Sequence, residues 1–98
     1  NSINKQYISH INIVNIINNE VFKYNYAVLH CIKYELFDDD NDFNIAFDKL
    51  KELIDTDSEI ELSYRYFISI IETKLKRGGN ANLASNIQYA NSKLKTLI

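Results

Sequence analysis

The chain contains no proline and only two glycines, Gly78 and Gly79, among its 98 residues. Proline breaks a helix because it lacks a backbone N–H, and glycine weakens a helix because its backbone is too free. Their scarcity leaves long stretches free to form uninterrupted helices. With 46% hydrophobic residues and a formal net charge of −2, the composition is that of an ordinary globular protein rather than a disordered, nucleic-acid-binding or membrane-surface chain.

Cysteine and histidine are also scarce. Cys31 is the only cysteine, so no disulfide can form within the chain, and His10 and His30 are the only histidines. This set is too small for a zinc site, and neighbours such as His30 and Cys31 point about 100° apart on a helix, so they do not form a nucleophile–base pair. We therefore predict no catalytic residue, no metal ligands and no cofactor, and expect the protein not to be an enzyme.

Methionine is absent, so Asn1 is not a translation start, and we expect the chain to be trimmed or processed from a longer one. The composition favours Ile, Asn, Lys and Tyr, whose codons are AT-rich, which indicates a low-GC bacterium or its phage, a protist or a large DNA virus. No signal peptide or membrane-length apolar run is visible, which favours a cytoplasmic protein without membrane contact. No linker divides the sequence, so residues 1–98 are predicted to form a single domain.

Apolar residues recur along the whole chain at the three- and four-residue spacing of amphipathic helices. The pattern predicts an all-α fold of about five antiparallel helices, over residues 3–18, 20–37, 42–55, 59–77 and 81–97. The acidic segment 38–42 supplies N-cap candidates for the third helix, and Gly78-Gly79 is expected to end the fourth. The predicted core stripe of the first helix comprises Ile3, Tyr7, Ile11, Val14 and Ile17. That of the third comprises Phe43, Ala46, Phe47, Leu50, Leu53 and Ile54.

The helix predicted over residues 20–37 carries two apolar stripes rather than one. The first stripe comprises Phe22, Tyr26, Leu29, Ile32 and Leu36. The second, beside it, comprises Val21, Tyr24, Val28 and Cys31. An apolar surface of that width predicts that this helix packs on two neighbours.

The acidic segment 38–44 also places side-chain oxygens at the first, third, fifth and seventh positions of a calcium-binding loop. Such a loop needs glycine at its sixth position and glutamate at its twelfth, and these positions hold Phe43 and Lys49. Phe43 also belongs to the apolar stripe of the following helix. We therefore interpret the segment as a solvated loop and helix cap, not as a metal site.

At an offset of 40 residues, the apolar positions of residues 20–55 fall in phase with those of residues 59–97. A period of this length is typical of stacked helical hairpins, although two amphipathic hairpins of similar length can also be slid into phase. The segment Asp42-Phe43-Asn44-Ile45-Ala46-Phe47 resembles the second helix of tetratricopeptide-like repeats, and the resemblance covers residues 20–97. It implies a helical-hairpin stack that binds a protein or peptide. A small closed bundle is the alternative architecture.

Two Tyr-x-Tyr pairs stand out among the seven tyrosines. Residues two apart on a helix point in nearly opposite directions, so one tyrosine of each pair can be buried and the other exposed. The stripes place Tyr26 and Tyr64 inward and leave Tyr66 exposed with Tyr24 beside it, although codon bias and core packing also explain the tyrosines. The predicted partner-binding residues are Tyr24, Tyr66, Arg65 and Lys23.

These observations predict a non-enzymatic protein–protein interaction module with a protein or peptide partner. The alternative is a small helical immunity or antitoxin-like protein of a low-GC bacterium or phage, which fits the size, the helix count and the lack of motifs. The one basic run, Lys74 to Arg77, has no recognition-helix context, so nucleic acid is not an expected partner. The oligomeric state and the choice between open stack and closed bundle stay open.

Overall fold

The computed structural model describes the backbone of residues 2–98 and the side chains of residues 19–98. It is helical almost throughout, and its described part contains no strand, which confirms the predicted all-α fold. In chain order the elements are α1 (Ser2–Phe37), α2 (Asp40–Asp55), α3 (Glu61–Lys76), the short 3-10 turn η1 (Ala81–Leu83) and α4 (Ala84–Leu97).

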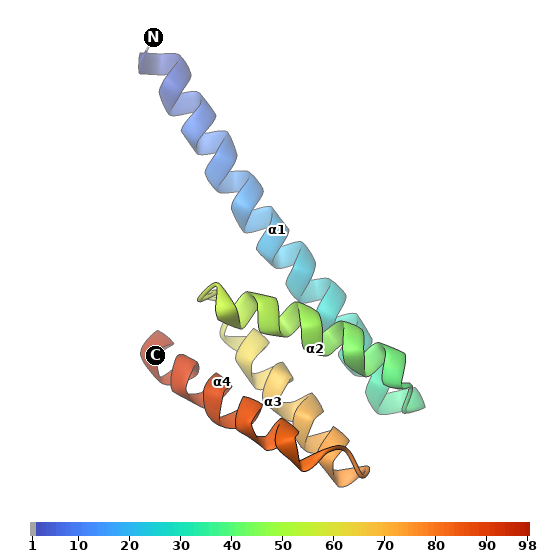
Figure 1. Cartoon of the computed structure of the whole chain (residues 1–98). Helices are drawn as coiled ribbons and strands as arrows, with labels where there is room; N and C mark the ends of the chain where they lie inside the picture. Colours follow the sequence, from blue (N-terminus) through green and yellow to red (C-terminus); the bar gives the residue numbers. More distant parts are fainter. Residues whose placement is uncertain (1) are drawn as a thin grey trace.

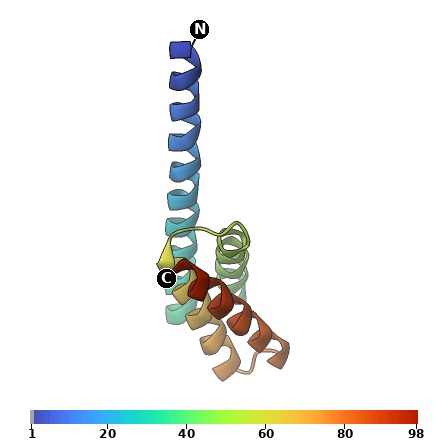
Figure 2. The same ribbon diagram turned by 90° about the vertical axis from the view of Figure 1, so that its left-hand side faces the viewer.

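The prediction of five helices is wrong, because the segments 3–18 and 20–37 form one continuous helix, α1. The expected boundary at residues 18–19 consists of two asparagines, which weaken a helix only slightly and keep the backbone N–H groups that continue it. The N-terminal half of α1 extends away from the other helices (Figures 1 and 2). The stripe predicted for residues 3–17 lies outside the described side chains.

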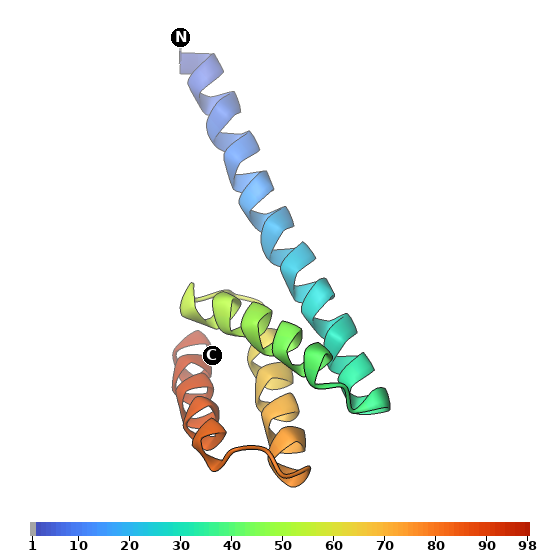
Figure 3. The same cartoon turned by 45° about the vertical axis from the view of Figure 1, so that its right-hand side comes forward.

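The helices form two antiparallel hairpins that pack on each other. α1 and α2 are joined by a short turn at residues 38–39, and α3 and α4 run side by side below them (Figures 1 and 3). α2 packs on both α1 and α3, and α4 packs mainly on α3. In the part of the chain that the structure describes, no helix is both long enough and apolar enough to cross a membrane.

The core lies where α2 and α3 meet the C-terminal half of α1. The stripe predicted for α2 is confirmed, except that Phe47 is only half-buried. α1 contributes the small residues Ala27 and Cys31 together with Tyr34, which lets the neighbouring helices approach closely. The buried apolar residues of α3 and α4 are Tyr64, Phe67, Ile70, Ile71, Ala90 and Leu94.

Local signals fix the turns between the helices. Asp39 is the N-cap of α2, as predicted from the acidic segment, and its carboxylate accepts a hydrogen bond from the Asn41 N–H at 2.8 Å. α3 ends where Gly78 adopts a φ of +93°, a left-handed conformation that glycine accepts without steric cost. These two turns direct α2 back along α1 and α4 back along α3.

Candidate functional site

The surface of α1 opposite the core is apolar and exposed. Phe22, Leu29 and Leu36 are spaced by seven residues, so they lie in one row along the helix. Their exposed fractions are 71%, 53% and 70%. The row and the exposed apolar residues beside it form what we call the outer face of α1, which comprises Val21, Phe22, Tyr26, Leu29, Ile32, Leu36 and Phe37.

This face holds most of the large exposed apolar side chains among residues 19–98. Seven of the nine large hydrophobic residues that are exposed among the described side chains belong to it, and the other two, Leu62 and Ile98, are isolated. Phe22 and Leu36 stand about 21 Å apart along the helix, at 1.5 Å per residue. An exposed apolar row of that length marks a binding site far more often than single exposed residues do.

Only one of the two stripes predicted for α1 is therefore covered. Of the second stripe, Cys31 is buried, Tyr24 and Val28 are half-buried and only Val21 is exposed, whereas every residue of the first stripe is exposed. The prediction that Tyr26 points inward is wrong, because the core contacts α1 along Ala27, Cys31 and Tyr34 instead. α1 does pack on two neighbours, α2 and α3, as the width of its apolar surface predicted. Both lie on the side of Ala27, Cys31 and Tyr34, so the first stripe stays uncovered by the described helices.

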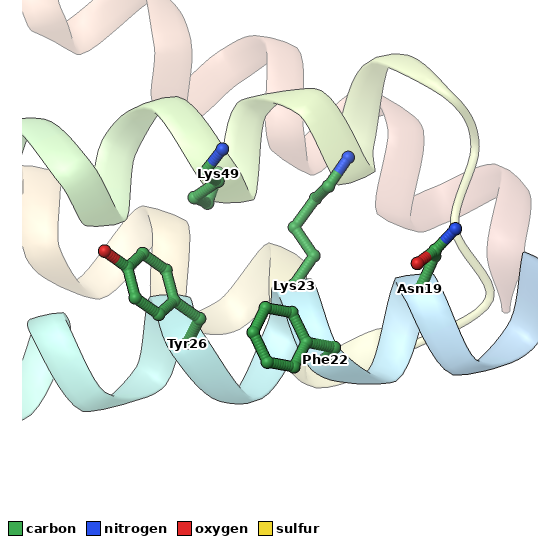
Figure 4. Close-up of a pocket in the computed structure, with 5 residues that line it drawn as sticks. All are labelled: Asn19, Phe22, Lys23, Tyr26 and Lys49. Carbon is green, nitrogen blue, oxygen red and sulfur yellow. The ribbon is translucent and has the colours of Figure 1, made fainter.

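A groove of about 400 Å³ runs along one edge of the outer face, between α1 and α2. The rings of Phe22 and Tyr26 stack along it, 6.3 Å apart between centroids with their planes at 12° (Figure 4). Its lining residues are Asn19, Phe22, Lys23, Tyr26 and Lys49. The groove thus combines two aromatic rings with two ammonium groups.

The lysines of the groove are held by a carboxylate just outside its lining. Lys23 Nζ lies 2.9 Å from Glu52 Oε2, and Lys49 Nζ lies 4.0 Å from Glu52 Oε1. The hydrogen bond from Lys23 holds the pKa of Glu52 below its ordinary value, against the opposing effect of burial. The two ammonium groups therefore stay at the rim, where they can meet acidic groups of a ligand.

The structure brings some of the predicted partner-binding residues together and separates another. Tyr24 and Tyr66 are both half-buried, and their rings meet edge to face with centroids 6.3 Å apart. Arg65 is exposed nearby and pairs with Glu61, with Nη2 at 2.6 Å from Oε1. Lys23, in contrast, pairs with α2 on the other side of α1.

Beside this tyrosine pair the surface is only shallowly hollowed. A depression of about 190 Å³ on α3 is lined by Leu62, Arg65, Tyr66 and Ser69. Tyr64, the other tyrosine of the second pair, is buried as predicted, and its hydroxyl donates a 2.7 Å hydrogen bond to the Ser58 carbonyl. The tyrosines thus serve mainly the contacts between helices.

One buried polar cluster was missed by the sequence analysis. His30 Nδ1 lies 2.7 Å from Asp42 Oδ1, and Lys33 Nζ lies 3.5 Å from the same oxygen. The hydrogen bond with His30 is the main cause that holds the pKa of Asp42 below its ordinary value. The cluster ties α1 to the first turn of α2, and no sequence signal links two residues on different helices.

Two kinds of group that could carry chemistry are the Cys31 thiol and clusters of metal-ligating side chains. Burial raises the pKa of the Cys31 thiol to about 12, so it is a poor nucleophile beside His30. Among the described residues, no group of three or more histidine, cysteine, aspartate or glutamate side chains is placed to hold a metal ion.

Comparison with known proteins does not connect this surface to an established function. No model of a protein family matches the chain, and neither does any curated protein sequence or solved structure. The function is therefore argued from the chain's own surface.

Proposed function

We propose that the protein is a non-enzymatic protein–protein interaction module, and that the outer face of α1 is its binding surface. The observation that supports this most directly is the exposed row Phe22, Leu29 and Leu36 on the helix surface opposite the core. Apolar surface contributes about 25 cal/mol per Å² when it leaves water, so this row is a source of binding free energy that the fold itself does not use.

The composition of the surface fits a protein partner. Large aromatic side chains dominate the binding energy of protein interfaces, and Phe22 and Tyr26 supply two stacked rings at the groove. Lys23 and Lys49 add charge at its edge, where a polar rim is usual. An apolar helical segment with polar residues along its edges has the complementary chemistry.

The predicted immunity or antitoxin-like role is a special case of this proposal. Proteins of that kind also act by binding another protein, and they need no catalytic residue. The tetratricopeptide-like resemblance leads to the same class of function, with a peptide or protein segment as ligand. Both hypotheses therefore require that the chain binds a protein, whichever surface it uses.

Site-specific photo-crosslinking tests the proposal directly. A photoreactive amino acid is introduced at Phe22 or at Leu36, and the protein is irradiated both alone and in an extract of the organism that encodes it. We expect a covalent adduct with a protein from either position. The matched control is Leu62, which is also an exposed leucine but lies on α3 beside Arg65 and Tyr66.

The three positions distinguish the candidate surfaces. Adducts from Phe22 and Leu36, with none from Leu62, support the outer face of α1 as the binding surface. Adducts from Leu62 alone would move the site to the tyrosine surface of α3. The absence of an adduct at every position, alone and in the extract, would overturn the interaction-module proposal.

A further inference from the structure

Among the described side chains of α1, the exposed apolar residues are arranged symmetrically about Leu29. Phe22 and Leu36 lie seven residues before and after it, and Tyr26 and Ile32 lie three residues before and after it. The two polar residues on the same surface, exposed Asn25 and half-exposed Lys33, lie four residues before and after it. Apolar positions thus mirror apolar positions along the helix, and polar positions mirror polar ones.

We propose that the outer face of α1 binds the same face of a second copy of this chain, with the two α1 helices antiparallel. The proposal rests on the proposed function, because it names the partner of that surface. In a two-fold symmetric interface each residue i meets a residue j while j meets i, so the surface must be complementary to itself. The mirrored pattern about Leu29 has this property.

An antiparallel pair with its two-fold axis at Leu29 matches the residues layer by layer. Phe22 of each copy faces Leu36 of the other, and the two Leu29 side chains meet at the axis. Tyr26 of one copy lies in the same layer as Ile32 of the other. A parallel pair would instead place both Lys33 residues in one layer, where their charges, each partly offset by Asp42 at 3.5 Å, disfavour the pairing.

The end of α1 fixes the length over which the two helices overlap. α1 ends at Phe37, eight residues after Leu29, so two antiparallel helices centred on Leu29 overlap from residue 21 to residue 37. Within this overlap the outer face supplies apolar residues from Val21 to Phe37.

The rest of the fold leaves this face free to approach a second copy. α2 and α3 contact α1 along Ala27, Cys31 and Tyr34, which lie on the opposite side of the helix from Leu29. The other helices all lie to one side of α1 (Figures 1 and 3). Two α1 helices can therefore pack at the usual interaxial distance of about 8–10 Å with one hairpin pair on each outer side.

Analytical ultracentrifugation of the purified chain over a range of concentrations tests the self-association. We expect a monomer–dimer equilibrium whose dissociation constant rises by at least about 100-fold in Leu29→Asp, because two carboxylates would meet in an apolar contact. The matched control is Leu62→Asp, since Leu62 is 52% exposed and Leu29 is 53% exposed. It should dimerise like the unchanged protein, and circular dichroism checks that both variants stay helical.

Engineered cysteines test the orientation of the helices. Leu29→Cys should form an intermolecular disulfide readily, because residue 29 lies on the two-fold axis. Phe22→Cys alone should not, whereas a mixture of Phe22→Cys and Leu36→Cys proteins should form a mixed disulfide. Efficient linkage of Phe22→Cys with itself would show parallel helices and overturn the proposed arrangement.

The dimerisation experiments can fail while the proposed function still holds. A chain that stays monomeric at every concentration, and whose Leu29→Cys variant does not cross-link, overturns the second copy as partner. In that case photo-adducts of Phe22 or Leu36 with a different protein leave the interaction-module proposal intact. If these adducts are missing as well, both proposals fail.

Discussion

Tyr24 of α1 and Tyr66 of α3 meet edge to face, with ring centroids 6.3 Å apart and planes at 68°. Both side chains are half-buried and pack against the core. Burial, and after it the neighbouring Tyr66 hydroxyl, raises the pKa of Tyr24. The two residues that the sequence analysis placed at a partner surface therefore contact each other and join the two hairpins.

A double-mutant cycle measures this contact. Tyr24→Ala and Tyr66→Ala should each lower the free energy of unfolding, and the two effects should be coupled by about 0.5–1.5 kcal/mol, the usual worth of an aromatic pair beyond its buried area. Urea unfolding of the two single variants and the double variant gives the coupling. Additive effects would show that the rings do not interact.

Helical periodicity predicted the packing of α2 well, since a single apolar stripe offers only one way to face a core. It could not choose between the two stripes of α1, because that choice depends on which surfaces of α2 and α3 fit against it. The small Ala27 lets the neighbouring helices approach α1 closely on its own side, and Tyr26 on the other side stays exposed. The contact of His30 with Asp42 could not be predicted from the sequence either, because it joins two helices across a turn.

Arg77, just after α3, binds the C-terminal end of α1, and its substitution should lower the free energy of unfolding. Its Nη1 and Nη2 donate 3.0 Å hydrogen bonds to the carbonyls of Tyr34 and Glu35, and its guanidinium lies 4.9 Å from the centroid of the Tyr34 ring. Arg77→Lys keeps the charge but loses the planar fork. We expect about 1–2 kcal/mol of lost stability by urea unfolding.

The matched control for Arg77 is Lys76→Ala, at an exposed position one residue earlier. It should change the stability by less than about 0.5 kcal/mol, as surface substitutions usually do. If Arg77→Lys is as stable as this control, the positive charge alone stabilises the end of α1, and the two guanidinium hydrogen bonds add nothing.

Asp42 should make the stability depend on acid pH. Its pKa is lowered in the folded state, chiefly by the hydrogen bond with His30, so the unfolded chain binds the proton more tightly. The stabilisation is fully present above the unfolded pKa of about 3.9 and is lost as the pH falls through the lower folded pKa. Below about pH 5, the melting temperature should therefore fall more steeply in the unchanged protein than in Asp42→Asn.

The comparison with Asp42→Asn isolates this group. The pKa values of Glu52 and Asp55 are also lowered, but these residues are present in both proteins and cancel in the difference. Melting curves recorded by circular dichroism at several acid pH values provide the measurement. Parallel pH profiles for the two proteins would show that the contact with His30 does not stabilise the Asp42 carboxylate.

Cys31 should be unreactive in the folded protein. It is 2% exposed, and burial raises the pKa of its thiol to about 12. Ellman's reagent at neutral pH should therefore modify it only after denaturant is added, whereas a cysteine introduced at exposed Lys95 should react at once. Fast modification of Cys31 without denaturant would place the thiol on an accessible surface and contradict the packing of α1 on the core.

Two phenylalanines compare the buried core with the exposed outer face of α1. Phe67 is fully buried, with its ring 5.0 Å from that of Phe47, whereas Phe22 is 71% exposed. Phe67→Ala should cost about 3–5 kcal/mol of stability, because it removes a large side chain from a packed core.

Phe22→Ala should cost less than about 0.5 kcal/mol when urea unfolding is measured at a concentration low enough for the chain to be monomeric. At higher concentration, dimerisation through the outer face would stabilise the unchanged protein but stabilise Phe22→Ala less, so the difference between them should grow. Equal and large losses for both variants in the monomer would mean that α1 buries Phe22 within its own chain, and the surface on which the proposed function depends would not exist.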